Sequence, residues 1–218
     1  MNNILSSRRM LGACALLIAF VLLIVLVTCV DVRPIGPQNS TIGLAGINGW
    51  FRDLTGENDG AYMISEILGY MALLTVPGFC LLGVWQLWQR KSFAKVDRDL
   101  YALAVFYGIV AVAYVFFEIV VVNYRPVMPE GELEASFPSS HTLLALCTLG
   151  AATVQARLRV KDRKLCQVVC AITLGIAAVV VLTRLFSGVH WLTDILGGLL
   201  LGSALVLLYR EAVHRLKA

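Results

Sequence analysis

Long apolar stretches alternate with short polar segments along the whole chain. The stretches contain roughly 20 residues each, enough for a helix to cross about 30 Å of hydrocarbon. Their apolar residues run continuously and do not alternate with polar ones, as the strands of a membrane barrel would. The pattern therefore predicts an all-α integral membrane protein, a six-helix transmembrane bundle with spans over residues 10–30, 61–88, 100–122, 139–156, 165–186 and 191–209.

Composition agrees with this class. Hydrophobic residues make up 59% of the 218 positions and charged residues 15%, whereas about a quarter of a soluble domain is charged. We expect residues 1–218 to form a single polytopic membrane domain. The segment 31–60 is too polar to enter lipid and is expected to lie over the outer surface, with Trp50 and Phe51 at the interface.

The positions of Lys and Arg predict the orientation of the bundle. Most of them lie at the N-terminus, in the turns after the second and fourth spans, and at the C-terminus. Cytoplasmic loops carry an excess of these residues. Both termini are therefore expected in the cytoplasm of a cell-membrane protein. Because topology accounts for the net charge of +4, we expect no nucleic-acid partner.

Three polar segments lie at the opposite, outer ends of the predicted spans: residues 123–126, 137–142 and 183–194. Polar side chains are costly in lipid, so such segments are where function is to be sought. The ends of neighbouring helices in a bundle can meet. We therefore expect the three segments to form one site, which binds an anion and contains a nucleophile.

The last segment contains an arginine and a histidine–aspartate pair. Arg184, like Arg125 in the first segment, lies on the side with few basic residues, and a guanidinium binds phosphate oxygens in a bidentate manner. His190 and Asp194 are one helical turn apart. A carboxylate that fixes one imidazole nitrogen leaves the other as a nucleophile or base. The alternatives are interfacial arginines and a structural hydrogen-bonded pair.

Residues 138–141, Pro-Ser-Ser-His, predict the start of a helix. Ser139 would cap it, and the free backbone N–H groups behind Ser139 and Ser140 attract phosphate. His141 lies in the first turn, where it could protonate a leaving oxygen. An ordinary serine cap beside an interfacial histidine is the alternative. Glu66, near the outer end of the second span, is a weaker candidate, for which a solvated helix end is the alternative.

Together the three segments resemble the signature of the phosphatidic acid phosphatase type 2 superfamily, which includes lipid phosphate phosphatases and bacterial undecaprenyl-diphosphatase-like enzymes. The family motifs are Lys, six residues, Arg-Pro; Pro-Ser-Gly-His; and Ser-Arg, five residues, His, three residues, Asp. With both spacings of the third motif kept, the matching residues are Arg125, Pro126, Pro138, Ser139, His141, Arg184, His190 and Asp194.

The resemblance implies a membrane phosphatase that hydrolyses a lipid phosphate or diphosphate on the extracytoplasmic face. His190 would attack phosphorus to give a phosphohistidine, Asp194 would orient its ring, and His141 would protonate the departing alkoxide. The phosphoryl oxygens would be held by Arg125, Arg184, Ser139 and backbone N–H groups near Ser140. No metal or other cofactor is implied, because two guanidiniums supply the positive charge.

Three residues depart from the family pattern. Thr183 replaces the serine and keeps a hydroxyl, and Ser140 replaces the glycine. Glu118 occupies the position of the lysine. An ionised carboxylate there repels phosphate unless it pairs with an arginine, is protonated through burial, or contacts a cationic headgroup. Glu118 is therefore expected to tune the choice of substrate.

Several functions are compatible with these residues. The substrate could be phosphatidate, phosphatidylglycerophosphate or undecaprenyl diphosphate, and a lipid phosphotransferase would use the same groups. A non-catalytic anion-binding, lipid-binding or transport protein would need only the arginines. A metalloenzyme could use His141, His190 and Asp194 as ligands, although the arginines would repel the cation. The expected partners are the lipid phosphate substrate and membrane lipid.

Overall fold

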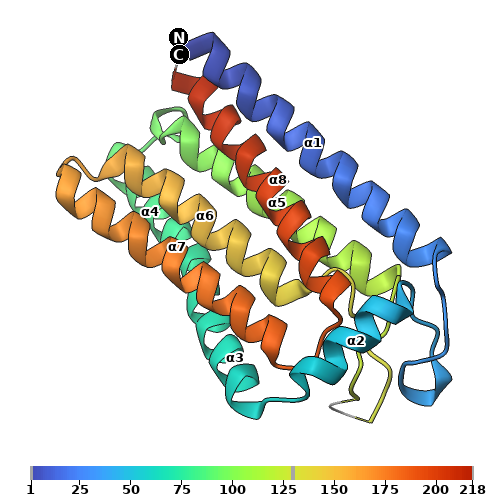
Figure 1. Cartoon of the computed structure of the whole chain (residues 1–218). Coiled ribbons are helices and arrows are strands. Elements are labelled where there is room, and N and C mark those ends of the chain that lie inside the picture. Colours follow the sequence, from blue (N-terminus) through green and yellow to red (C-terminus); the bar gives the residue numbers. More distant parts are fainter. Residues whose placement is uncertain (1, 129–130, 218) are drawn as a thin grey trace.

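The computed structural model describes residues 2–128 and 131–217 (Figure 1). Within these residues the regular structure is helical, apart from two isolated backbone bridges. This confirms the all-α prediction. The helices are α1 (Asn2–Cys29), α2 (Ala45–Thr55), α3 (Asp59–Leu73), α4 (Thr75–Arg90), α5 (Arg98–Ile119), α6 (Ser140–Arg159), α7 (Arg163–Phe186) and α8 (Leu192–Lys217), with short 3-10 turns η1 (Pro37–Asn39) and η2 (Phe93–Lys95).

Five segments are long and apolar enough to cross a membrane, which agrees with the predicted class. They are Ser7–Cys29, Asp59–Arg90, Arg98–Ile119, Arg163–Phe186 and Leu192–Lys217. The remaining predicted span, 139–156, forms α6, which is too polar to belong with these five. Its Thr148, Thr153 and Gln155 are buried, and α6 contacts α3, α4, α5, α7 and α8. The polar residues of α6 therefore face protein.

The second predicted span is interrupted. Instead of one helix over 61–88, α3 ends at Leu73 and α4 begins at Thr75. Pro77 has no backbone N–H to give to the carbonyl of Leu73, and its ring crowds that carbonyl. The hydroxyl of Thr75 also bonds the carbonyl of Ala72 at 2.7 Å. As a result α3 takes a different direction from α4 (Figure 1).

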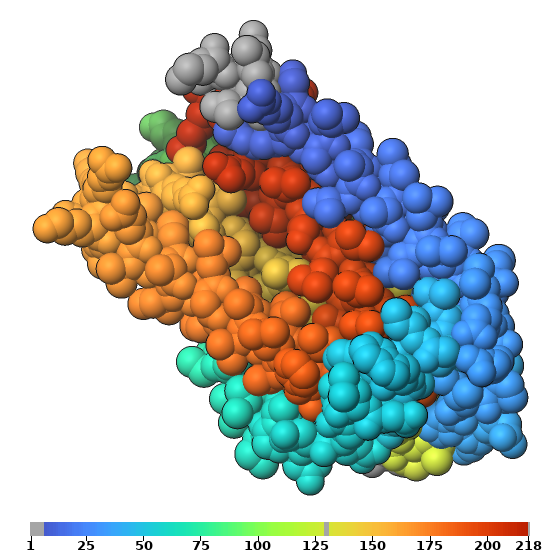
Figure 2. Space-filling view, viewed as in Figure 1, coloured from blue at the N-terminus to red at the C-terminus, as the bar shows by residue number. Residues whose placement is uncertain are grey.

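The segment between α1 and α3 lies across one end of the bundle, where α2 crosses the start of α8 (Figure 1). The buried side chain of Asn48 bonds the hydroxyl of Thr193 at 3.0 Å and accepts from its backbone N–H at 3.2 Å. Arg52 donates to the carbonyl of Gly188 at 2.7 Å. In Figure 2 this segment covers the surface between α7 and α1. It therefore fixes the loop that leads into α8.

The main apolar core lies between α1, α5, α6 and α8, and it includes Phe137, three residues before α6 begins. Phe137, which is 1% exposed, stacks on Phe20 with 5.9 Å between ring centroids and meets Phe117 edge-on at 6.2 Å. The core thus holds the chain in place where α6 begins.

Helices α6 and α8 approach closely because α8 carries glycines at the contact. A Cβ atom at Gly198 would lie 2.9 Å from Thr142 and 3.0 Å from the carbonyl oxygen of Ser139, and one at Gly202 would lie 3.1 Å from Leu146. Small residues allow such close approach between helices in membranes. The contact brings the first turns of α6 and α8 together.

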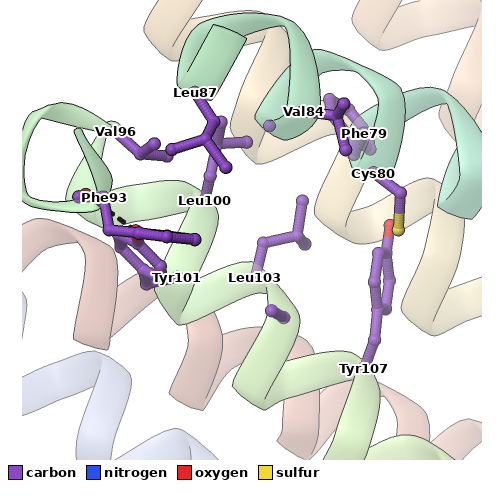
Figure 3. Close-up of a pocket in the computed structure, with 12 residues that line it drawn as sticks. Phe79, Cys80, Val84, Leu87, Phe93, Val96, Leu100, Tyr101, Leu103 and Tyr107 are labelled. Atoms are coloured by element: carbon purple, nitrogen blue, oxygen red, sulfur yellow. Dashed lines mark hydrogen bonds between the residues drawn. The ribbon is translucent and has the colours of Figure 1, made fainter. Parts of the chain in front are cut away.

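An apolar cavity of about 330 Å³ separates α4 from α5 (Figure 3). Its walls include Phe79, Leu87, Val96, Leu103 and Tyr107. None of its lining residues is charged, so the cavity could accommodate a lipid chain, and it contains no candidate catalytic group.

Alanine substitution tests the α6–α8 contact. Gly198→Ala should lower the thermal unfolding temperature of the protein in detergent, because the added Cβ meets backbone as well as side chain, at a cost of about 1–3 kcal/mol. Gly175→Ala on α7 is the control, since nothing lies within 4 Å of its Cβ position. At position 175, alanine should stabilise α7 by up to about 1 kcal/mol. Equal effects of the two substitutions would contradict the close packing.

Candidate active site

The three polar segments meet at the end of the bundle that α2 crosses. The backbone N–H of Ser139 bonds the carbonyl of Asp194 at 2.9 Å. The indole N–H of Trp191 bonds the carbonyl of Tyr124 at 2.7 Å. Segments that are far apart in the sequence are thus joined by direct hydrogen bonds, and their polar side chains form one cluster.

His190 is 5% exposed and lies in the loop between α7 and α8. The prediction that His190 and Asp194 share a helix face is wrong, because α8 begins only at Leu192. His190 Nδ1 is 3.7 Å from Asp194 Oδ2, too far for a hydrogen bond. The hydroxyl of Ser136 lies between them, 3.0 Å from Nδ1 and 2.5 Å from Oδ2.

Ser136 therefore connects the histidine to the carboxylate, a link that the sequence did not reveal. Its hydroxyl donates to Asp194, so its oxygen accepts from the Nδ1–H of His190. The backbone N–H of Trp191 also donates to Asp194 Oδ2, at 2.8 Å. Ser136 directly precedes the predicted segment 137–142, and only its buried position would have identified it.

The second ring nitrogen of His190 is left with a lone pair. Nε2 is buried and has no hydrogen-bond partner within the described part of the chain. Burial lowers the pKa of His190 well below its ordinary value, and the positive charges of Arg184 and Arg125 lower it further. The ring is therefore neutral at pH 7, with Nε2 available as a nucleophile.

Arg184 is completely buried near the end of α7. Its Nη1 donates to the hydroxyl of Ser65 at 3.0 Å and to Oε1 of Glu66 at 2.9 Å. Its Nη2 is 2.8 Å from Nδ1 of His141, and the guanidinium lies 5.3 Å from the ring centroid of Tyr62. Nε has no partner among the described residues, so this N–H is available to a ligand.

His141 and Glu66 contact each other as well as Arg184. His141 Nε2 is 3.2 Å from Oε1 of Glu66, whose side chain is 19% exposed. The alternative that Glu66 only marks a solvated helix end is therefore wrong, because its carboxylate contacts two of the candidate residues, Arg184 and His141. The sequence placed Glu66 near one end of the second predicted span but gave no sign of its partners.

Arg125 lies in the segment 123–137, which folds back on itself through a bridge between Tyr124 and Ala135. Its Nε is 3.2 Å from Oε2 of Glu134 and 3.5 Å from the carbonyl oxygen of Ala135. Each of the two candidate arginines is thus paired with a glutamate.

The predicted serine cap is present. Ser139 is the N-cap of α6 and accepts from the backbone N–H of Thr142 at 3.5 Å, while Ser140 is the first helical residue. Ser140 and Ser136 line a small recess together with Glu118. Glu118 is exposed on α5, and the described residues give it no ion pair. An ion pair between Glu118 and an arginine, which was one of the roles considered for Glu118, is therefore not seen among the described residues.

The metal alternative gains no support from the side chains. Among the described residues, no three His, Cys, Asp or Glu side chains are grouped as a metal site requires. His141 and His190 contact different carboxylates, Glu66 and Asp194, and they lie near the two arginines.

Comparison with known proteins gave two matches. The family model described as PAP2 superfamily matches residues 120–218. The fold resembles the crystal structure of the first transmembrane PAP2 type phosphatidylglycerolphosphate phosphatase from Bacillus subtilis, with a TM-score of 0.66 and 20% sequence identity over 94% of this chain and 96% of that chain. The search of curated proteins found no match.

The region matched by the family model contains all three polar segments, including Arg125, His141, Arg184, His190 and Asp194. The structural likeness extends over nearly the whole chain, so the helices that precede this region also follow the same fold. Residues 120–218 thus match the PAP2 superfamily, and the fold of the chain resembles that of a transmembrane PAP2 type enzyme.

Proposed function

We propose that this protein is a membrane phosphatase that hydrolyses a lipid phosphate or diphosphate through a phosphohistidine at His190, without a metal ion. The observation that carries the proposal is the buried Nε2 of His190, which has no hydrogen-bond partner among the described residues and feels the positive charges of Arg184 and Arg125. A nucleophilic nitrogen near two guanidiniums suits attack on an anionic phosphorus centre.

In the first step Nε2 attacks phosphorus, and the bond from phosphorus to the leaving oxygen breaks. The imidazole ring becomes positively charged, and its Nδ1–H remains bonded to Ser136, whose hydroxyl donates to Asp194. The carboxylate thus stabilises the new charge through one hydroxyl. Arg184 and Arg125, with Ser139 and the backbone near Ser140, bind the phosphoryl oxygens as charge shifts onto the leaving group.

His141 completes the two steps. It protonates the leaving alkoxide in the first step and takes a proton from water in the second. The water oxygen attacks phosphorus, the bond to His190 Nε2 breaks, and inorganic phosphate is released. Both histidines then return to their initial protonation states.

The proposal places the site on the extracytoplasmic face. Arg9, Arg157, Arg210 and Lys217 line one cavity of about 310 Å³, and both termini lie at the end of the bundle remote from α2 (Figure 1). The excess of basic residues supports a cytoplasmic location for that end. In this orientation α6 would cross the membrane in addition to the five apolar segments, shielded from lipid by its neighbours.

The membrane setting favours a lipid substrate, whose headgroup would reach the depth of the site. The similar Bacillus subtilis protein is described as a phosphatidylglycerolphosphate phosphatase, so phosphatidylglycerophosphate is the first substrate to test. Phosphatidate and undecaprenyl diphosphate complete the panel, and added alcohols would detect phosphoryl transfer to an acceptor other than water.

The central experiment measures phosphate release from this panel by the purified protein in detergent with excess chelator. Release should continue in chelator, and His190→Ala should lower it by more than about 10³-fold because the nucleophile is lost. Release that stops in chelator would refute metal independence. A folded protein that binds lipid phosphate without releasing phosphate would favour a binding or transport role.

Ser136→Ala tests the link between His190 and Asp194. The rate constant kcat should fall about 10- to 100-fold with little change in KM, because one charge-assisted hydrogen bond forms fully only when the ring becomes cationic. Ser187→Ala is a matched control, since this buried hydroxyl bonds the carbonyl of Arg184 at 2.8 Å and is not bonded to the ring of His190. An unchanged kcat in Ser136→Ala would show that the serine does not transmit the carboxylate's effect.

Glu118→Gln tests the residue at the family's lysine position. Removing a negative charge beside Ser140 should strengthen phosphate binding, and KM should fall about two- to fivefold for this exposed group. Asp59→Asn, on the exposed first turn of α3, removes a charge elsewhere on the same side and should have no effect. Unchanged kinetics of Glu118→Gln across the substrate panel would exclude a role for Glu118 in the site.

A further inference from the structure

We propose that Glu66 on α3 is the positioning carboxylate of His141. It would hold one ring nitrogen of the general acid so that the other delivers the proton, as Asp194 acts on His190 through Ser136. This inference rests on the proposed function and adds to it a residue outside the three polar segments.

The hydrogen bonds around His141 define its tautomer. The guanidinium of Arg184 is only a donor, so Nδ1 of His141, 2.8 Å from Nη2, must accept. The ring proton of neutral His141 is therefore on Nε2, which lies 3.2 Å from Oε1 of Glu66. The contact with Glu66 thus uses the ring nitrogen that is not bonded to Arg184.

The ring has little freedom to turn from this orientation. Tyr70 meets it edge-on, with 6.4 Å between ring centroids. A Cβ atom at Gly69 would lie 2.8 Å from Cδ2 of His141, so the backbone of α3 runs directly against the ring. Glu66, Gly69 and Tyr70 all belong to α3, which therefore supplies both the carboxylate contact and the packing that fix His141.

This arrangement suits a general acid. When His141 takes up a second proton on Nδ1, the carboxylate of Glu66 stabilises the cation through its contact with Nε2. An Nδ1–H cannot accept from Arg184, so protonation also releases an Nη2–H to bind a phosphoryl oxygen. Nδ1 then gives its proton to the leaving oxygen as the phosphorus–oxygen bond breaks. In the second step the attacking water returns a proton to Nδ1.

The neighbouring Ser65 provides a comparison within the same turn. Its hydroxyl accepts from Arg184 Nη1 at 3.0 Å and donates to the carbonyl of Tyr62 at 2.6 Å, but it has no hydrogen bond to His141 among the described residues. Loss of Ser65 should therefore disturb the orientation of Arg184 alone. Loss of the Glu66 charge should disturb His141 as well.

Leaving-group dependence separates these two effects. The full-length protein in detergent is assayed with p-nitrophenyl phosphate, whose leaving group needs no proton, and with octyl phosphate, whose alkoxide must be protonated. Glu66→Gln should lower kcat for octyl phosphate about 10- to 100-fold, as expected for a lost charged hydrogen bond. The same variant should lower kcat for p-nitrophenyl phosphate much less, which also shows that it is folded. Ser65→Ala should lower both rates by the same factor.

A double-mutant cycle gives a second test. In the background of His141→Ala, Glu66→Gln should lower the rates for octyl phosphate and p-nitrophenyl phosphate by the same factor, because only its effect through Arg184 remains. Equal losses for both substrates in Glu66→Gln alone, or a larger loss with octyl phosphate in the double variant, would overturn the proposal. A folded wild-type protein that hydrolyses neither substrate nor any lipid phosphate would instead overturn the proposed function, and this inference with it.

Discussion

Burying a guanidinium inside a helical membrane bundle costs several kcal/mol unless its N–H groups and its charge are matched. Arg184 is completely buried, and two helices provide contacts that offset this cost. Helix α3 supplies Ser65, Glu66 and the ring of Tyr62, and α6 supplies His141. The positions of α3, α6 and α7 at this end of the molecule are therefore linked through one side chain.

The same region depends on close packing between backbones. Gly198 lets α8 approach the first turn of α6, so that Ser139 reaches the carbonyl of Asp194, while Asn48 and Thr193 hold α2 against the start of α8. The candidate residues of the three polar segments thus lie in loops and in the first or last turns of helices, at one end of the bundle. This agrees with the distribution of polar residues along the sequence, where most of each span is apolar.

The helices and the polar segments could be predicted because their signals are local: continuous apolar runs, a Pro-Ser cap, and fixed spacings within one motif. The contacts of Ser136 and Glu66 could not, because their partners lie more than 50 residues away and a single serine or glutamate has no distinctive pattern. His190 lies outside α8 because the loop at Ser187 and Gly188, with a positive φ at Gly188, is held by Arg52. Only the interruption at Pro77 had a local signal that the span assignment overlooked.

The pairing of Arg184 with Glu66 and of Arg125 with Glu134 means that each guanidinium already has a carboxylate beside it. An incoming phosphate must compete with these carboxylates for the positive charge of the two guanidiniums. A phosphodiester headgroup carries one negative charge and gains little in that exchange, whereas a phosphate monoester near neutral pH carries up to two. If the proposed function holds, the paired arginines would disfavour binding of the abundant phosphodiester lipids of a membrane relative to binding of a phosphate monoester.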